Sequence, residues 1–257
     1  EHYYQPGWTM GGGGVFDAPV TCRPMASVMP ERAHWIRRAA ASFQPEANRV
    51  TLDDGSTIEY KLLVVAPGIR LAWEQIKGLE ETLGRNGVTS NYRYDLAPYT
   101  WELVRNLKSG RAIFSQPPMP IKCAGAPQKA MYLSCDAWAE RGVLDAIDVE
   151  FRNAGGVLFG VEAYVPVLMD YVARYGIDLK LQQKLVAVDG EAKTATFETI
   201  EGGETVGFDM LHAVPPQGAP NFLARSPLAQ AASGFVEVDK HTLQHPRFAN
   251  VFGLGDA

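Results

Sequence analysis

The stretch that decides the fold is RAIFSQPPMPIKCAGAPQKAMYLSCDAWAER, residues 111–141. It begins as a short apolar strand, passes through a Pro-rich turn and continues as a helix over 128–141. The same order of elements returns, with a strand predicted at 146–155, a helix at 161–176 and a strand at 177–190. Alternation of strands and helices is typical of an α/β architecture with a parallel sheet. The sequence therefore predicts this fold class.

The flanking segments add further elements. A hairpin around Asp54-Gly55 is predicted within 48–60, and an apolar strand at 62–66 ends at Pro67-Gly68. The other predicted elements are a helix at 95–108, two late meander strands at 193–200 and 204–214, and a strand within 249–257 that leads into Gly255-Asp256. Residues 1–34 are rich in glycine and proline and predict mostly loop. Gly11 to Gly14 predict a flexible loop, because no strand precedes them and the third glycine of GxGxxG is missing.

Composition excludes several classes of protein. Of 257 residues, 46% are hydrophobic and 21% charged, which indicates an ordinary globular protein of one or two domains. Lys and Arg total 24 against 29 Asp and Glu, and the net charge of −5 argues against nucleic-acid binding. Three scattered cysteines predict neither a disulfide framework nor a metal site. No transmembrane segment or signal peptide is predicted, and because the chain starts at Glu1 we expect it to be part of a longer protein.

Cys123 lies in an unusual turn. The prolines between Gln116 and Pro127 remove N–H donors and stiffen the turn, which suits positioning a side chain better than binding phosphate. The sequence thus predicts that a nucleotide site has been lost here and that NAD(P)H is not the partner. Pro127 suits the first helical turn, so Cys123 precedes a positive helix end with Lys122 beside it. Both features favour the reactive thiolate. The alternative is a small buried hydrophobic residue.

Two strand ends far apart in the chain form a second signal. LLVVAPG at 62–68 and VFGLGD at 251–256 are apolar strands that end in glycine turns, where a backbone can approach a ligand closely. Asp256 could accept hydrogen bonds from ribityl-type hydroxyl groups. Either segment alone is typical of an ordinary strand end. Together and in this order, they resemble FAD-binding oxidoreductases in which a second dinucleotide-binding domain is inserted within the first.

The sequence around Cys123 makes the resemblance specific to one family. PMPIKCAGAPQKAMYLS at 118–134 is similar to the mitochondrial-type branch of the sulfide:quinone oxidoreductases. Other stretches resemble the same family, in order along the whole chain: HYYQPGWT at 2–9, RPMASVMP at 23–30, SNYRYD at 90–95, LFGVEAY at 158–164, DMLHAVPP at 209–216, VDKHTLQH at 238–245 and NVFGLGD at 250–256.

The resemblance implies a fold and a domain order. It implies two Rossmann-like dinucleotide-binding domains, with a three-layer parallel sheet and a β-meander. Residues 1–108 and 226–257 would form a discontinuous FAD-binding domain, incomplete because its GxGxxG unit is expected upstream of Glu1. Residues 109–225 would form the inserted domain, with Cys123 at its first turn.

The resemblance also implies site residues. Cys123 would be the flavin-proximal cysteine that accepts sulfur, with Lys122 beside it. Residues at FAD-contacting positions are Gln5, Ala40 (through its backbone, near the adenine), Pro67, Gly68 and Asp256. Without the resemblance, Gln5 and Asp256 would be surface polar residues and Ala40 a helix-favouring one.

Three more residues have open alternatives. His212 could move protons at the quinone end, or be a structural, hydrogen-bonded histidine. The family's second redox cysteine is expected beyond the end of this chain. Cys22 could substitute for it, but is more typical of a surface or half-buried thiol. Cys135 lies twelve residues after Cys123; a helical rise of about 1.5 Å per residue places it roughly 18 Å away, outside disulfide reach, so we expect a core residue.

The implied activity is oxidation of hydrogen sulfide to sulfane sulfur, as a persulfide, with two electrons passing through FAD to a ubiquinone-type quinone. Glutathione or sulfite would accept the sulfur. The location would be peripheral, on the bacterial inner membrane or the mitochondrial inner membrane. Alternatives are a flavocytochrome-type sulfide dehydrogenase, a quinone-reducing NADH dehydrogenase, which would need glycines where Pro117 to Pro120 stand, and an inactive fragment or sulfane-sulfur carrier.

Overall fold

The computed structural model describes residues 1–257, which form two compact units. The first unit comprises Glu1–Val28 and Ala72–Pro216, and the second comprises Met29–Leu71 and Gln217–Ala257. These limits differ from the predicted division into 1–108 with 226–257 and 109–225. The difference arises because the helix near residue 100 contacts the sheet of the first unit, and the N-terminal helix packs against this helix and the one after Cys123. The predicted assignment of an FAD-binding and an inserted domain stays a prediction.

The first unit is built on a five-stranded parallel sheet with the order β11-β10-β9-β15-β8. The strands are β8 (Val88–Thr89), β9 (Gly110–Gln116), β10 (Ile147–Asn153), β11 (Asp178–Leu181) and β15 (Met210–His212). Successive residues of β9 face opposite sides of the sheet, and each side has its own buried core: Phe114 belongs to one core and Ile113 to the other. The α/β architecture predicted from the sequence is confirmed.

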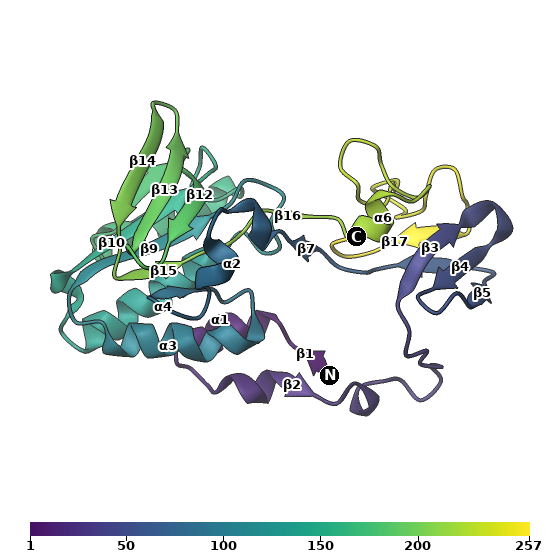
Figure 1. The fold of residues 1–257 in the computed structure, drawn as a ribbon, viewed down its shortest axis with the longest axis horizontal. Helices are drawn as coiled ribbons and strands as arrows, with labels where there is room; N and C mark the ends of the chain where they lie inside the picture. The colour runs from purple at the N-terminus through teal and green to yellow at the C-terminus, as the bar shows by residue number, and fades with distance from the viewer. The chain divides into compact units, whose positions relative to one another are not determined.

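Helices cover one face of this sheet (Figure 1). The helices packed on it include α3 (Ala97–Asn106) and α4 (Ala126–Glu140), and α1 (Pro6–Gly12) packs against these two. Helix α5 (Val165–Arg174) precedes β11, and the short α2 (Leu79–Thr82) precedes β8. The core on the helical face includes four large, fully buried side chains: Phe114, Met131, Trp138 and Phe151. The helices predicted at 95–108, 128–141 and 161–176 are therefore confirmed, with α5 beginning four residues late, after a short 3₁₀ turn.

A three-stranded antiparallel meander covers the other face (Figure 1). Its strands are β12 (Lys184–Asp189), β13 (Thr194–Thr199) and β14 (Gly202–Gly207). The prediction of one strand at 177–190 and a meander pair at 193–200 and 204–214 is wrong in detail. Gln182 takes a left-handed conformation (φ 57°) that separates β11 from β12, and the chain leaves β14 to return to the parallel sheet as β15.

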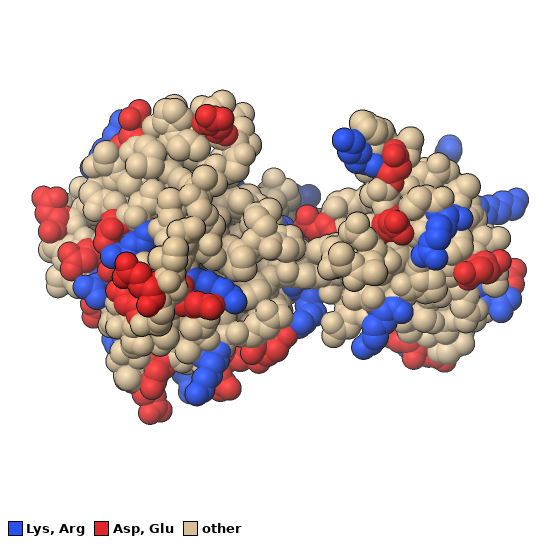
Figure 2. Space-filling model, turned by 90° about the horizontal axis from the view of Figure 1, so that it is seen from above, with Lys and Arg blue, Asp and Glu red and all other residues tan.

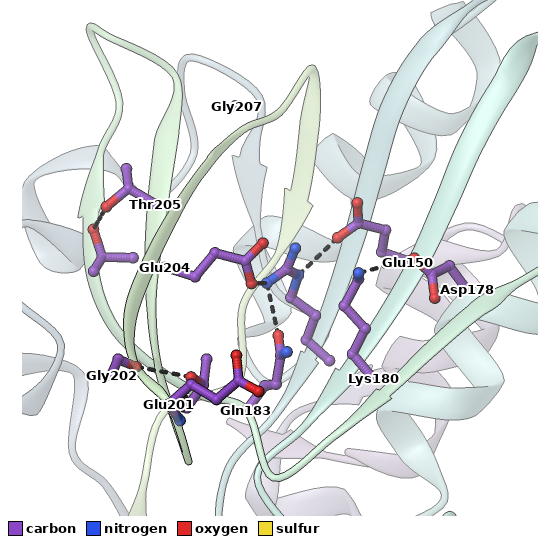
Figure 3. A network of polar contacts seen from close by, with 12 residues as sticks. Glu150, Asp178, Lys180, Gln183, Glu201, Gly202, Glu204, Thr205 and Gly207 are labelled. Atoms are coloured by element: carbon purple, nitrogen blue, oxygen red, sulfur yellow. Dashed lines mark hydrogen bonds and ion pairs between the residues drawn. The ribbon is translucent and has the colours of Figure 1, made fainter.

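A buried arginine ties the meander to the sheet. Arg152 on β10 is 1% exposed; its guanidinium donates to Glu150, Gln183 and Glu204, each at 2.7 Å. Figure 3 shows these three acceptor side chains converging from β10, from the loop before β12 and from β14. A buried charge is tolerated only when it is paired. Because Arg152 on the parallel sheet needs its partners before β12 and on β14, the cluster fixes the position of the meander on the sheet.

The prediction of a flexible loop at Gly11 to Gly14 is wrong. Gly11 and Gly12 belong to α1 and are buried, and Gly13 caps its C-terminus. A Cβ on Gly12 would come within 2.1 Å of the Asn91 side chain, and one on Gly13 within 2.7 Å of Leu133. The glycines therefore allow α1 to approach its neighbours closely, which outweighs their low helix propensity.

The second unit contains small sheets around its own core. Its strands are β3 (Ala40–Gln44), β4 (Arg49–Leu52) and β5 (Thr57–Glu59), which form an antiparallel sheet; β6 (Leu63–Val65) and β17 (Val251–Gly253), a parallel pair; and β7 (Arg70–Leu71) and β16 (Gln217–Gly218), an antiparallel pair. The hairpin predicted around Asp54-Gly55 is confirmed by the β4–β5 pairing. Phe43, Val65, Leu223 of α6 (Asn221–Ala224) and Val251 are buried together.

The surface carries both signs of charge. On the face seen in Figure 2, acidic and basic side chains are interspersed on both units. No helix has both the length and the apolar character needed to cross a bilayer.

Candidate functional site

Cys123 lies beyond the carboxyl end of β9. The strand ends at Gln116, and the following turn runs to Gly125, where α4 begins with Pro127 in its first turn. Cys123 is exposed and takes a left-handed backbone conformation, φ 58°. The prediction that this cysteine immediately precedes a helix N-terminus is confirmed. Its side chain is therefore accessible to a small nucleophile at the positive end of a helix.

Two hydrogen-bond donors hold the main chain at Cys123. The Tyr92 hydroxyl lies 2.8 Å from the Lys122 carbonyl oxygen and 3.2 Å from that of Cys123. The Ala126 N–H donates to the Cys123 carbonyl at 2.9 Å. Tyr92 itself is 4% exposed and follows β8, at the same edge of the parallel sheet.

Lys122 joins Cys123 to the N-terminal helix. Its ammonium group contacts Oε1 of Gln5, the residue just before α1. The same Nζ atom lies 5.9 Å from the centroid of the Trp8 ring and 5.6 Å from that of Tyr92, within the range of cation–π attraction. Three residues predicted for the site, Gln5, Lys122 and Cys123, are thus brought together in the first unit. A catalytic role for Lys122 stays a prediction.

His212 lies at the end of β15 and is completely buried. Its ring stacks on Phe114, with 5.8 Å between centroids, and its Nε2 accepts the Asn91 N–H at 2.9 Å. Burial lowers the pKa of His212 to about 4, so the imidazole is neutral near pH 7. These contacts favour the structural alternative for His212. Proton transfer by this residue stays a prediction.

The other two cysteines differ from Cys123. Cys135 on α4 is fully buried, and burial raises the pKa of its thiol to about 12. Cys22 is half-buried with Sγ 3.4 Å from Glu1 Oε2; burial and this neighbouring carboxylate raise the pKa of its thiol. Their predicted places in the core and at a half-buried position are confirmed. Cys123 is therefore the one exposed thiol of the three.

The second unit holds the predicted FAD contacts Pro67, Gly68 and Asp256. They follow β6 and β17, which pair in parallel, so both turns leave the same edge of the pair. Gly68 and Gly255 have φ values of 76° and 72°, and a Cβ on either would meet nothing within 4 Å. Two open glycine turns side by side fit the close approach of a dinucleotide.

Ala40, the remaining predicted contact, lies apart from these turns as the first residue of β3. It pairs with Leu52 of β4. Its predicted backbone contact with adenine stays a prediction.

Sequence reasoning missed Tyr92 as a functional residue. A sequence signal for this position was present: Ser90, Asn91 and Tyr92 directly follow the strand β8, whose carboxyl end lies beside that of β15. Contact with Cys123 across 31 residues of chain could not be recognised from spacing alone.

Comparisons with known proteins agree with the resemblance drawn from the sequence. No family model matches the chain. It is 44% identical over 257 residues to the mitochondrial sulfide:quinone oxidoreductase of Dictyostelium discoideum and 39% identical over 259 residues to that of Mus musculus. Both alignments cover 100% of this chain and 57% of the relative, so the chain spans little more than half of these relatives. The predicted resemblance is confirmed.

A solved structure shows the same fold. The sulfide:quinone oxidoreductase of Aquifex aeolicus matches with a TM-score of 0.83 at 23% identity, over 99% of this chain and 59% of that one. The Rossmann-like α/β class predicted from the sequence is confirmed.

Proposed function

We propose that this chain forms part of an FAD-dependent sulfide:quinone oxidoreductase, which oxidises hydrogen sulfide to sulfane sulfur and passes two electrons to a quinone. The observation that carries the proposal is Cys123: the one exposed thiol, at the start of α4, within the stretch that resembles the family. The match of this chain to 57% of the length of relatives named for this activity supports it.

The sulfur step uses Cys123 in a disulfide with the second cysteine that the resemblance implies outside this chain. Hydrosulfide attacks one sulfur of this disulfide and the S–S bond breaks. The attacked sulfur then carries a persulfide, and the other leaves as a thiolate. Exposure of Cys123 admits hydrosulfide to its sulfur atom. Sulfane sulfur then passes to a small nucleophile such as glutathione or sulfite.

FAD, when bound, supplies the two-electron acceptor between the thiolate and quinone. In the second unit, the open turns at Gly68 and Gly255 would admit it, and Asp256 would accept hydrogen bonds from its hydroxyl groups. In the first unit, Gln5 is held beside the Cys123 turn through Lys122. We assign Gln5, Ala40, Pro67, Gly68 and Asp256 to cofactor binding within this proposal.

The location follows from the relatives. Those from Dictyostelium discoideum and Mus musculus are named as mitochondrial proteins. Because ubiquinone resides in the bilayer, we place the protein peripherally at an inner membrane, mitochondrial in a eukaryote.

The experiment is sulfide-dependent reduction of a soluble ubiquinone analogue by the whole enzyme of which we propose this chain is part, with Cys123→Ser and Cys22→Ser compared. We expect activity in the parent and in Cys22→Ser, and none in Cys123→Ser. Equal activity in Cys123→Ser would contradict the assignment of Cys123. Reduction of cytochrome c in place of the quinone would indicate a flavocytochrome-type dehydrogenase instead.

A further inference from the structure

The backbone of Cys123 needs support from its surroundings. Its φ of 58° lies in the left-handed region, where the Cβ of a non-glycine residue crowds the neighbouring carbonyl oxygen. Rotation about the N–Cα bond to an ordinary negative φ would turn the Cα–Cβ bond, and the thiol with it, in another direction. Such conformations persist at functional sites when other contacts hold them.

The Tyr92 hydroxyl supplies such a contact. It lies within hydrogen-bond distance of the carbonyl oxygens of Lys122 and Cys123, whose carbonyl carbons are the two ends of the φ torsion of Cys123. Its ring also lies beneath the Lys122 ammonium group. One buried side chain therefore restrains the turn at consecutive residues.

Tyr92 is itself held firmly. Its N–H donates to Oγ of Ser90 at 3.2 Å, and the preceding residue, Asn91, donates its N–H to His212 at the end of β15. Ser90 and His212 are both fully buried. The hydroxyl is thereby anchored to the parallel sheet.

We infer that Tyr92 is a positioning residue for Cys123: its hydroxyl keeps the turn in the left-handed conformation that presents the thiol to sulfide. The inference rests on the proposed function, since it concerns the same thiol. The hydroxyl lies against two main-chain oxygen atoms of the turn, so it acts on the direction of the thiol.

The test is Tyr92→Phe, which keeps the ring and removes the hydroxyl. The protein is first reduced, so that Cys123 is a free thiol, and is then alkylated briefly with iodoacetamide; the ratio of Cys123 to Cys22 modification is measured by mass spectrometry. Loss of one hydrogen bond of about 1 kcal/mol shifts a conformational equilibrium about fivefold, and we expect the ratio to fall by up to that factor. Sulfide turnover should show a lower kcat with an unchanged KM for quinone.

The matched control is Tyr99→Phe, which removes a hydroxyl that accepts the Gly87 N–H at 3.1 Å in the same unit. Its labelling ratio should equal that of the parent. An unchanged ratio in Tyr92→Phe, or an equal fall in Tyr99→Phe, would overturn the inference. A lower ratio in Tyr92→Phe with no sulfide oxidation by the parent would uphold the positioning role and reject the proposed function.

Labelling of the buried Cys135 reports unfolding in the same experiment. If Tyr92→Phe exposes Cys135, the milder Ser90→Ala replaces it, because it removes only the acceptor of the Tyr92 N–H. We expect Ser90→Ala to lower the ratio in the same direction, and an unchanged ratio there would count against the inference.

Discussion

The imidazole of His212 accepts a hydrogen bond from the backbone N–H of Asn91 at 2.9 Å, across 121 residues of chain. The bond joins the end of β15 to the segment after β8. An acceptor Nε2 is unprotonated, so the neutral ring carries its proton on Nδ1. Protonation of Nε2 would remove this contact inside a fully buried site.

Stability should therefore fall on acidification in a way that depends on His212. Its pKa is about 4 in the folded protein against 6.5 ordinarily, so between these values the unfolded chain binds a proton that the folded chain does not. The contribution of neutral His212 to the free energy of unfolding is complete above pH 6.5 and is lost as the pH falls toward 4. Between pH 7 and pH 5 the loss is about 2 kcal/mol.

Urea unfolding of the parent and His212→Gln at pH 7 and pH 5 checks this. The parent should lose about 2 kcal/mol more than the variant. Burial also lowers the pKa of His245, but this residue is present in both proteins and its share cancels. Equal losses of unfolding free energy in the two proteins would contradict the assignment of this pH dependence to His212.

Replacing Arg152 should destabilise the first unit strongly. Arg152→Met leaves the buried Glu150 carboxylate with Arg111, at 3.2 Å, as its remaining ion-pair partner. Removing one partner of a buried pair costs about 3 kcal/mol. The measurement is the free energy of unfolding in urea.

Lys180→Met is the matched control, because Lys180 pairs with Asp178 at 3.0 Å near the surface. Exposed pairs contribute roughly 0–1 kcal/mol, so this variant should be nearly neutral. A similar small loss in both variants would show that the Arg152 cluster does not hold the meander.

Flavin binding should depend on Gly68. Gly68→Val places a side chain in the open space beside the β6 turn, where the proposal has the cofactor approach the backbone. Gly55→Val is matched, since Gly55 also has a positive φ (82°) and open space at its Cβ, but lies in the β4–β5 hairpin. We expect flavin content to fall in Gly68→Val alone. Equal flavin content in the two variants would contradict the placement of the cofactor beside Gly68.

The elements that sequence reasoning recovered are those with local signals. The strand before Gln116 and the helix that starts near Pro127 follow from apolar periodicity and from proline at a helix start. Together they predict the position of Cys123. The two apolar strands that end in the glycine turns of Gly68 and Gly255 were also predicted, whereas their parallel pairing is a finding of the structure.

The features that were missed depend on contacts between distant residues. Gly12 lies in a helix because Asn91 packs against it, which local propensity cannot indicate. The break at Gln182 is a single left-handed residue inside the stretch predicted as one strand, 177–190. Tyr92 meets Cys123 only because β8 and β9 end at the same edge of the sheet.

The most direct test of the central claim is the visible absorption spectrum of the purified whole enzyme of which we propose this chain is part, with FAD supplied, before and after anaerobic sulfide. We expect flavin bands that bleach with sulfide in the parent, and bands of equal intensity that do not bleach in Cys123→Ser. Equal bleaching in Cys123→Ser would contradict the role of Cys123. Absence of flavin bands from the parent even with FAD supplied would contradict the cofactor assignment for this chain.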